Sequence, residues 1–146
     1  MSQTATELRA VLADTFAFYF RAHVFHWNVT GPLFFSLHQF FGNLYVELFD
    51  AVDPIAEQIR ALHELAPASL FELLKPATIN HEDYTPGTVQ EMITELLSHN
   101  DHVLQALYVA HDAAEQEKHD GVVNFIEDRI DKHAKIAWQL RAHLVE

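Results

Sequence analysis

The apolar residues of this chain recur every three or four positions in four long segments, the spacing expected for one face of a helix. The segments cover about residues 4–28, 33–62, 85–117 and 120–144. Gly31-Pro32 separates the first two segments, and Thr85-Pro86 is a favourable helix start, with threonine as the N-cap. Asp120 can cap the last segment. The pattern therefore predicts an all-α bundle of four helices.

A long connection joins the second helix to the third. Residues 63–86 contain three prolines and one short apolar run, Ser69–Lys75, that predicts a helix of two turns. Such a link is longer than an antiparallel hairpin needs and fits a ferritin-like bundle with a long crossover. Pro54 lies inside the second helix and is expected to kink it or distort one turn. Residues 1–146 together fit a single domain.

The apolar stripes also predict which side chains face inward. The third stripe includes Tyr108, and the fourth includes Val123, Ile130 and Ala134. Six phenylalanines of the first two helices fall outside the stripes: Phe18, Phe20, Phe25, Phe35, Phe40 and Phe49. A monomeric bundle would leave some of them in water, so this surplus indicates a second buried face and hence an oligomer.

The composition narrows the classes of function. The chain has 9 lysines and arginines against 21 acidic residues, a formal net charge of −12, whereas proteins that grip nucleic acid through its phosphates carry a basic face. No apolar run is long enough to predict a membrane span, and no secretory signal is recognisable at the N-terminus, so we expect a cytoplasmic protein. Its 11 histidines are the unusual feature, because histidine is both a common metal ligand and a pH switch.

Four residues are candidates for a metal site: His26, His38, Asp53 and Glu57. The two carboxylates are four residues apart and share a helix face, and with imidazoles they form a ligand set suited to iron or zinc. The alternatives are a solvated acidic face and a capping or core histidine. Asp53 lies 15 residues after His38, about 22 Å along one straight helix. If these residues share an ion, the ligands must come from two chains around a two-fold axis.

The segment HWNVTGPLFFSLH, followed by the run DPIAE that begins at Asp53, resembles the signature of the Dps family, and the coarse pattern extends the resemblance over nearly the whole chain. The resemblance implies a twelve-subunit hollow cage that oxidises Fe(II), preferably with hydrogen peroxide, and stores the ferric product, protecting against oxidative stress. It also implies that His26 and His38 are ligands from one subunit and that Asp53 and Glu57 are ligands from its partner. Glu57 would bridge the ions if two irons bind.

One residue departs from the family pattern. Members usually carry an acidic residue four positions after the second histidine, where this chain has Gly42. One metal position therefore loses an oxygen ligand and either binds weakly or gains a substitute. His143 is a candidate substitute, with a surface histidine as the alternative, and some cyanobacterial members are similar in their histidine-richer centres. Zinc is expected to compete with iron at a histidine-rich site.

Asp120 matches an acidic position that lines the three-fold entry pores of the family. The next acidic position of the pore is Asn124 here, which reduces its charge. Glu127, Asp128 and Asp131 either supply charge instead or simply face the solvent.

Three other functions are alternatives to an iron-oxidising cage. Ordinary ferritins use Glu-x-x-His pairs within one bundle, and none of the 11 histidines has a glutamate three residues before it. A DNA-compacting structural protein commonly depends on a lysine-rich tail that this sequence lacks, so we expect no DNA binding near neutral pH. The third alternative is a cage that binds metal without fast oxidation, and it remains an alternative because Gly42 supplies no ligand. The sequence does not decide whether peroxide or oxygen is the oxidant.

Overall fold

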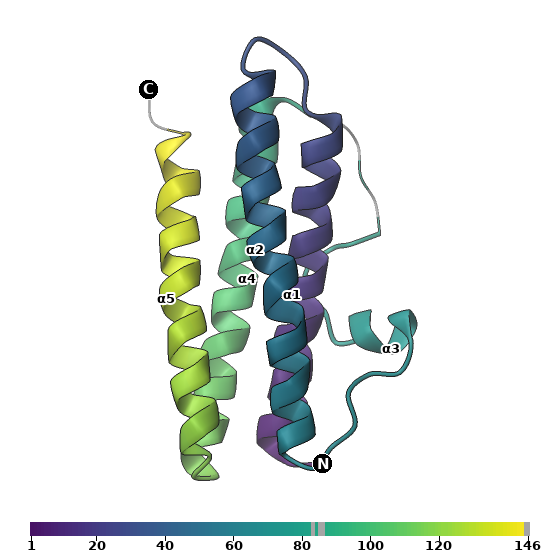
Figure 1. Ribbon diagram of the computed structural model, residues 1–146, viewed down its shortest axis with the longest axis vertical. Helices are drawn as coiled ribbons and strands as arrows, with labels where there is room; N and C mark the ends of the chain where they lie inside the picture. Colours follow the sequence, from purple (N-terminus) through teal and green to yellow (C-terminus); the bar gives the residue numbers. More distant parts are fainter. Residues whose placement is uncertain (83, 85–86, 145–146) are drawn as a thin grey trace.

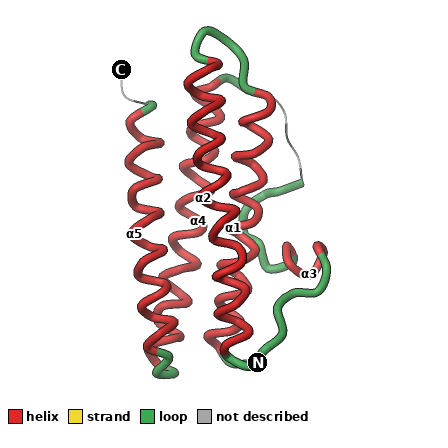
Figure 2. The backbone as a smooth tube through the Cα atoms, viewed as in Figure 1, coloured by secondary structure: helices red, strands yellow, loops and turns green. Residues whose placement is uncertain are grey.

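The computed structural model describes residues 1–82, 84 and 87–144. These residues form four long helices and one short helix, and they contain no strand (Figures 1 and 2). The helices are α1 (Gln3–Asn28), α2 (Phe34–Ala61), α3 (Leu70–Leu74), α4 (Val89–Gln116) and α5 (Asp120–Ala142). The predicted bundle, with a long crossover that carries a short helix, is confirmed.

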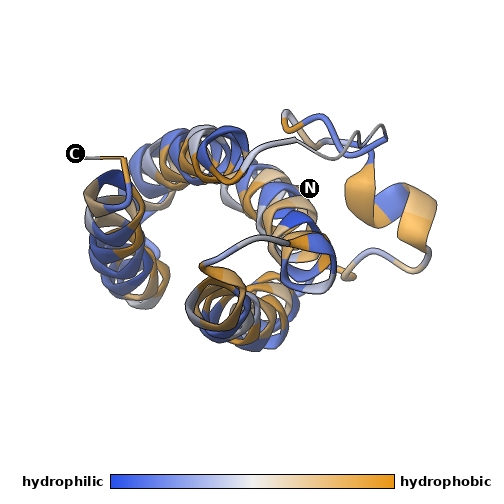
Figure 3. Ribbon diagram, turned by 90° about the horizontal axis from the view of Figure 1, so that it is seen from above, coloured by the Kyte–Doolittle hydropathy of each residue, from blue (hydrophilic) through white to orange (hydrophobic). Residues whose placement is uncertain are grey.

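The long helices stand side by side around one apolar core. Helix α1 packs against both α2 and α4, and α5 packs against α4. Viewed from above, the four long helices surround the core, and α3 lies outside them beside α1 (Figure 3). No helix among the described residues is long and apolar enough to cross a membrane.

Side-chain caps fix the N-termini of three of the five described helices. The Ser2 hydroxyl accepts a hydrogen bond from the Ala5 amide at 3.1 Å, and Ser69 caps the short helix in the same way. The predicted start of the third helix at Thr85-Pro86 falls outside the described residues. Within them, α4 begins at Val89 with Thr88 as its N-cap.

The prediction that Asp120 caps the last helix is wrong. His119 occupies the N-cap position of α5, and Asp120 is the first helical residue. An acidic side chain there still stabilises the helix, because it faces the positive end of the helix dipole. Helix α2 continues without a break through Pro54.

The core differs from the apolar stripes on three helices. Phe18 and Phe25 are buried, at 0% and 1% exposure, because α1 packs on two neighbours and so buries more than one face. On α5, Val123 and Ile130 are only half-buried and Ala134 is exposed. Tyr108 on α4 is exposed as well. The buried face of α5 is instead made by Val122, Ile126, Arg129, His133, Ile136, Ala137 and Leu140. Two of these side chains are polar, so an apolar stripe does not reveal this face.

A buried aspartate tethers the crossover to α1. The Asp14 carboxylate, with 0% exposure, accepts hydrogen bonds from the Thr78 amide at 2.7 Å, the Thr78 hydroxyl at 2.7 Å and the Ile79 amide at 3.1 Å. Nδ1 of His102 on α4 lies 2.8 Å from the Thr78 hydroxyl. The crossover is therefore held between α1 and α4 by polar contacts.

Candidate metal centre

The end of α1 and the beginning of α2 bring His26 and His38 face to face. Their rings stack with centroids 3.7 Å apart. Nδ1 of His26 donates to the His38 carbonyl at 2.7 Å, and Nδ1 of His38 donates to the His26 carbonyl, also at 2.7 Å. A carbonyl only accepts, so each Nδ1 carries a proton and Nε2 is the ring nitrogen that remains to bind a metal. Within the described chain, neither Nε2 has a hydrogen-bond partner.

The candidate carboxylates lie at the other end of α2. Asp53 and Glu57 are both exposed. About 22 Å of helix separates Asp53 from His38, at 1.5 Å per residue. The described residues of one chain accordingly hold no group of three His, Asp, Glu or Cys side chains that could bind one ion. One chain brings the two histidines together and leaves the two carboxylates apart from them.

Gly42 lies directly against His26. A β-carbon built on Gly42 would be 3.2 Å from both Cε1 and Nδ1 of the His26 ring, which is a tight contact. No other side chain of the described chain comes within 4 Å of that point. His143 packs elsewhere: its ring lies 4.4 Å from that of Phe40, and its Nδ1 donates to the Gln139 carbonyl at 2.8 Å.

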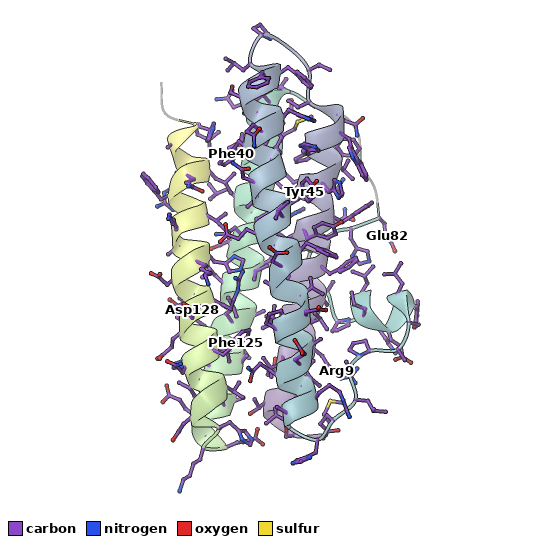
Figure 4. The ribbon with its side chains drawn as sticks, in the orientation of Figure 1. Arg9, Phe40, Tyr45, Glu82, Phe125 and Asp128 are labelled. Atoms are coloured by element: carbon purple, nitrogen blue, oxygen red, sulfur yellow. The ribbon has the colours of Figure 1, made fainter. Side chains whose placement is uncertain are left out.

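Phe40 and Tyr45 mark two different sides of α2. Phe40 contacts His143 of α5, and Tyr45 contacts His23 of α1. Figure 4 labels Phe40 and Tyr45 on α2. Within one subunit, His143 is therefore not beside Gly42. It could reach a metal centre only across a contact between subunits.

A third histidine, His23, stands next to this pair and is not among the four ligand candidates predicted from the sequence. Its ring stacks on Tyr45 at 3.8 Å, with the planes 6° apart, and also lies 4.1 Å from the Trp27 ring. Its Nδ1 is 3.0 Å from the Tyr19 hydroxyl. Burial and, to a lesser degree, His26 lower the pKa of His23. Its position three residues before His26, on the same helix face, was the signal that could have revealed it.

Exposed aromatic rings surround the histidines. Phe20, Trp27 and Phe49 are each about half exposed, and we call them the aromatic patch. Phe20 lies 6.1 Å from Trp27, and Phe49 lies 5.0 Å from the half-buried Tyr19. Phe20, Phe35 and Phe49 are surplus phenylalanines that the described chain leaves in water, as predicted for a surface that another subunit covers.

The candidate pore residues lie on the outer surface of α5. Asp120 and Asn124 are exposed, and so are Glu127, Asp128 and Asp131. Asp128 pairs with Lys132 at 3.0 Å, and Glu127 with His111 at 3.0 Å. Part of the acidic charge on this surface is therefore already paired within the chain.

Known proteins are similar to this chain in both sequence and fold. A family model described as "Ferritin-like domain" matches residues 5–146. The "DNA protection during starvation protein" of Brevibacillus brevis is 31% identical over 144 residues, which cover 96% of this chain and 93% of the relative.

Two solved structures extend the comparison. A Dps protein from Vibrio cholerae O1, described as "a member of a broad superfamily of ferritin-like diiron-carboxylate proteins", has a TM-score of 0.91 at 27% identity and covers 97% of this chain and 89% of its own. Dps from Thermosynechococcus elongatus has a TM-score of 0.94 at 26% identity, over 99% and 91% of the two chains.

Proposed function

Because this chain belongs to the Dps family of ferritin-like proteins, we propose that it oxidises ferrous iron between subunits and stores the ferric product inside a hollow cage. The observation that carries the proposal is the reciprocal pairing of His26 and His38. Each ring is held in orientation through Nδ1 and has no hydrogen-bond partner at Nε2 within the described chain, which is how proteins commonly prepare histidine to bind a divalent metal.

A second subunit would complete the site. On α2, Phe49, Asp53 and Glu57 follow one another at intervals of four residues and so share a face. If two copies of α2 cross antiparallel near Phe49, the histidines of one subunit lie opposite the carboxylates of the other. The exposed aromatic patch supports this arrangement, because its burial would help to hold the two subunits together.

The proposed reaction moves electrons from iron to an oxidant. One hydrogen peroxide accepts one electron from each of two ferrous ions, and hydrolysis of the ferric ions releases protons. The four residues His26, His38, Asp53 and Glu57 would bind the iron, with Glu57 between the two ions. Peroxide is the proposed oxidant, with oxygen as the alternative.

The assembly we propose is a homododecamer that takes up ferrous iron through acidic entry pores. Asp120 would line these pores, because it is exposed at the first residue of α5. The pores would carry less charge than those of other members, because the chain has Asn124 at the next position. Their acidic rim would attract cations and repel polyanions.

The centre should bind its two ions unequally. One position has two imidazoles and the partner's carboxylates, whereas the other faces Gly42 and lacks a carboxylate there. A centre rich in nitrogen ligands also suits zinc, so we propose that zinc competes with iron. His143 stays a candidate for the second position, but only across a subunit contact.

A second function, protection of DNA, is suggested by the name of the Brevibacillus brevis relative. We propose that any such protection here is chemical: removing ferrous iron and peroxide together would prevent damage without contact. The net charge of −12 argues against binding to a polyanion at neutral pH. A cage that binds metal and oxidises it only slowly is the alternative that Gly42 favours.

Stopped-flow measurement of Fe(II) oxidation by the assembled protein tests the proposal, with hydrogen peroxide and oxygen in parallel. We expect fast oxidation with peroxide, and loss of that phase in His26→Ala. His81→Ala, which alters an exposed histidine of the crossover, serves as the control. Oxidation no faster than in buffer would leave a cage that only binds metal.

A further inference from the structure

Gly42 leaves the second metal position without a ligand from α2. A β-carbon at position 42 would be in tight contact with the His26 ring, at 3.2 Å. A replacement ligand therefore has to come from another element, and α1 carries a suitable group beside His26.

His23 is one helical turn before His26, with ring centroids 6.2 Å apart. With metal–nitrogen bonds of about 2.1 Å, two imidazoles on one tetrahedral ion have ring centroids no more than about 5 Å apart. His23 and His26 are farther apart than that, so they would not normally share an ion. They are at a suitable separation to hold two neighbouring ions, one each.

The His23 ring is held as firmly as the two rings of the main pair. Tyr45 and Trp27 contact it at 3.8 and 4.1 Å, and Tyr19 engages its Nδ1 at 3.0 Å. Its Nε2 has no hydrogen-bond partner in the described chain and is not among the buried unpartnered atoms. His26 and His38 show the same pattern, with Nδ1 engaged and Nε2 free.

We propose that His23 is the third histidine ligand of this centre and binds the second ion through Nε2. In the tautomer that would bind a metal, Nδ1 of His23 donates to the Tyr19 oxygen and the lone pair is on Nε2. This inference rests on the proposed function, because the second ion also needs Glu57 of the partner subunit. The centre would then bind its second ion through nitrogen where other members use a carboxylate.

Cobalt(II) titration of the assembled protein without oxygen tests the role of His23, followed by calorimetry and by visible absorption. We expect wild type to bind a tight and a weaker ion per site. His23→Phe, which keeps an aromatic ring against Tyr45, should weaken the second ion by about 10-fold or more and leave the first unchanged. Tyr19→Phe removes only the hydroxyl and should weaken the second ion less. His81→Phe, which changes an exposed histidine of the crossover, is the matched comparison, and we expect no change.

The outcomes separate this inference from the proposed function. If Glu57→Ala loses cobalt but His23→Phe keeps both ions at wild-type affinity, His23 is not a ligand and the proposed function stands. If neither Glu57→Ala nor His26→Ala changes cobalt binding, the intersubunit site itself is wrong. Should His23→Phe fail to assemble, His23→Gln replaces it, since an amide can still bond Tyr19 but is a poor metal ligand, and the same loss is expected.

Discussion

His133 on α5 and Asn100 on α4 hold each other by two hydrogen bonds in the core. Nδ1 of His133 donates to Asn100 Oδ1 at 2.8 Å, and Nδ2 of Asn100 donates to the His133 carbonyl at 3.0 Å. The Arg129 guanidinium lies 3.0 Å from Nε2 of His133 and donates to it. This arrangement requires a neutral imidazole, and burial, followed by the Arg129 charge, lowers the pKa of His133 to about 3.

Lowering the pH should therefore decrease the free energy of unfolding before His133, or the second buried histidine His99, is protonated in the folded state. Burial, then Arg21 and His102, lower the pKa of His99 to about 4, against 6.5 in the unfolded chain. Between pH 6.5 and 4 the unfolded state binds protons that the folded state does not. Stability should fall there by up to about 1.4 kcal/mol per histidine per pH unit.

Urea unfolding at fixed protein concentration, followed by circular dichroism at several pH values, measures this slope. His99→Leu should make the dependence of stability on pH less steep, because it removes one of the buried histidines that titrate. His99 forms no hydrogen bond within the described chain, so leucine leaves no partner unsatisfied. His81→Leu changes an exposed histidine and should leave the slope as it is. A stability that is constant from pH 7 to 4.5 would contradict the prediction.

Asp14→Ala should destabilise the protein by about 3 kcal/mol, because it leaves the Thr78 and Ile79 amides without their buried acceptor. Urea unfolding measures the loss, and Asp112→Ala on the exposed face of α4 is the control. If the two variants are equally stable, Asp14 does not hold the crossover.

Glu57→Ala should slow Fe(II) oxidation by peroxide about 10- to 100-fold, because it removes a metal ligand from an exposed position. The cage should stay intact, since no large apolar contact is lost, and light scattering checks this. Asp112→Ala should oxidise iron at the wild-type rate. A wild-type rate in Glu57→Ala would remove Glu57 from the site.

Native mass spectrometry should find twelve chains of 16.7 kDa in one particle. Phe49→Asp should produce smaller species, because a buried unpaired carboxylate opposes the subunit contact. Phe49→Leu keeps the position apolar and should still assemble. A stable monomer or a particle of 24 chains would show that the proposed assembly is wrong.

Plasmid DNA should migrate unchanged in a gel at neutral pH and low salt, even with micromolar protein, because the chain carries a net charge of −12. At lower pH, protonation of exposed histidines reduces that charge, so binding could begin there. Retardation at neutral pH would contradict the prediction.

The sequence by itself determined the helices, the crossover and the four ligand candidates. Helical periodicity is local, and it identifies an element wherever apolar residues mark a single face. The residues of the metal signature could be recognised because their types and spacings are specific. The distance along α2 between His38 and Asp53 means that one ion could be shared by these residues only across two chains, since a helix has a fixed rise per residue.

Only the tertiary structure decided what each face packs against. The structure buries Phe18 and Phe25, although both lie outside the apolar stripe of their helix, because α1 contacts two helices. It placed Arg129 and His133 in the core, where hydrogen bonds between helices replace apolar contacts. It also brought His23 against Tyr45 and set His143 on Phe40, away from Gly42. Such contacts join residues that are distant along the chain, so the packing of helices, and not the spacing within one helix, determines them.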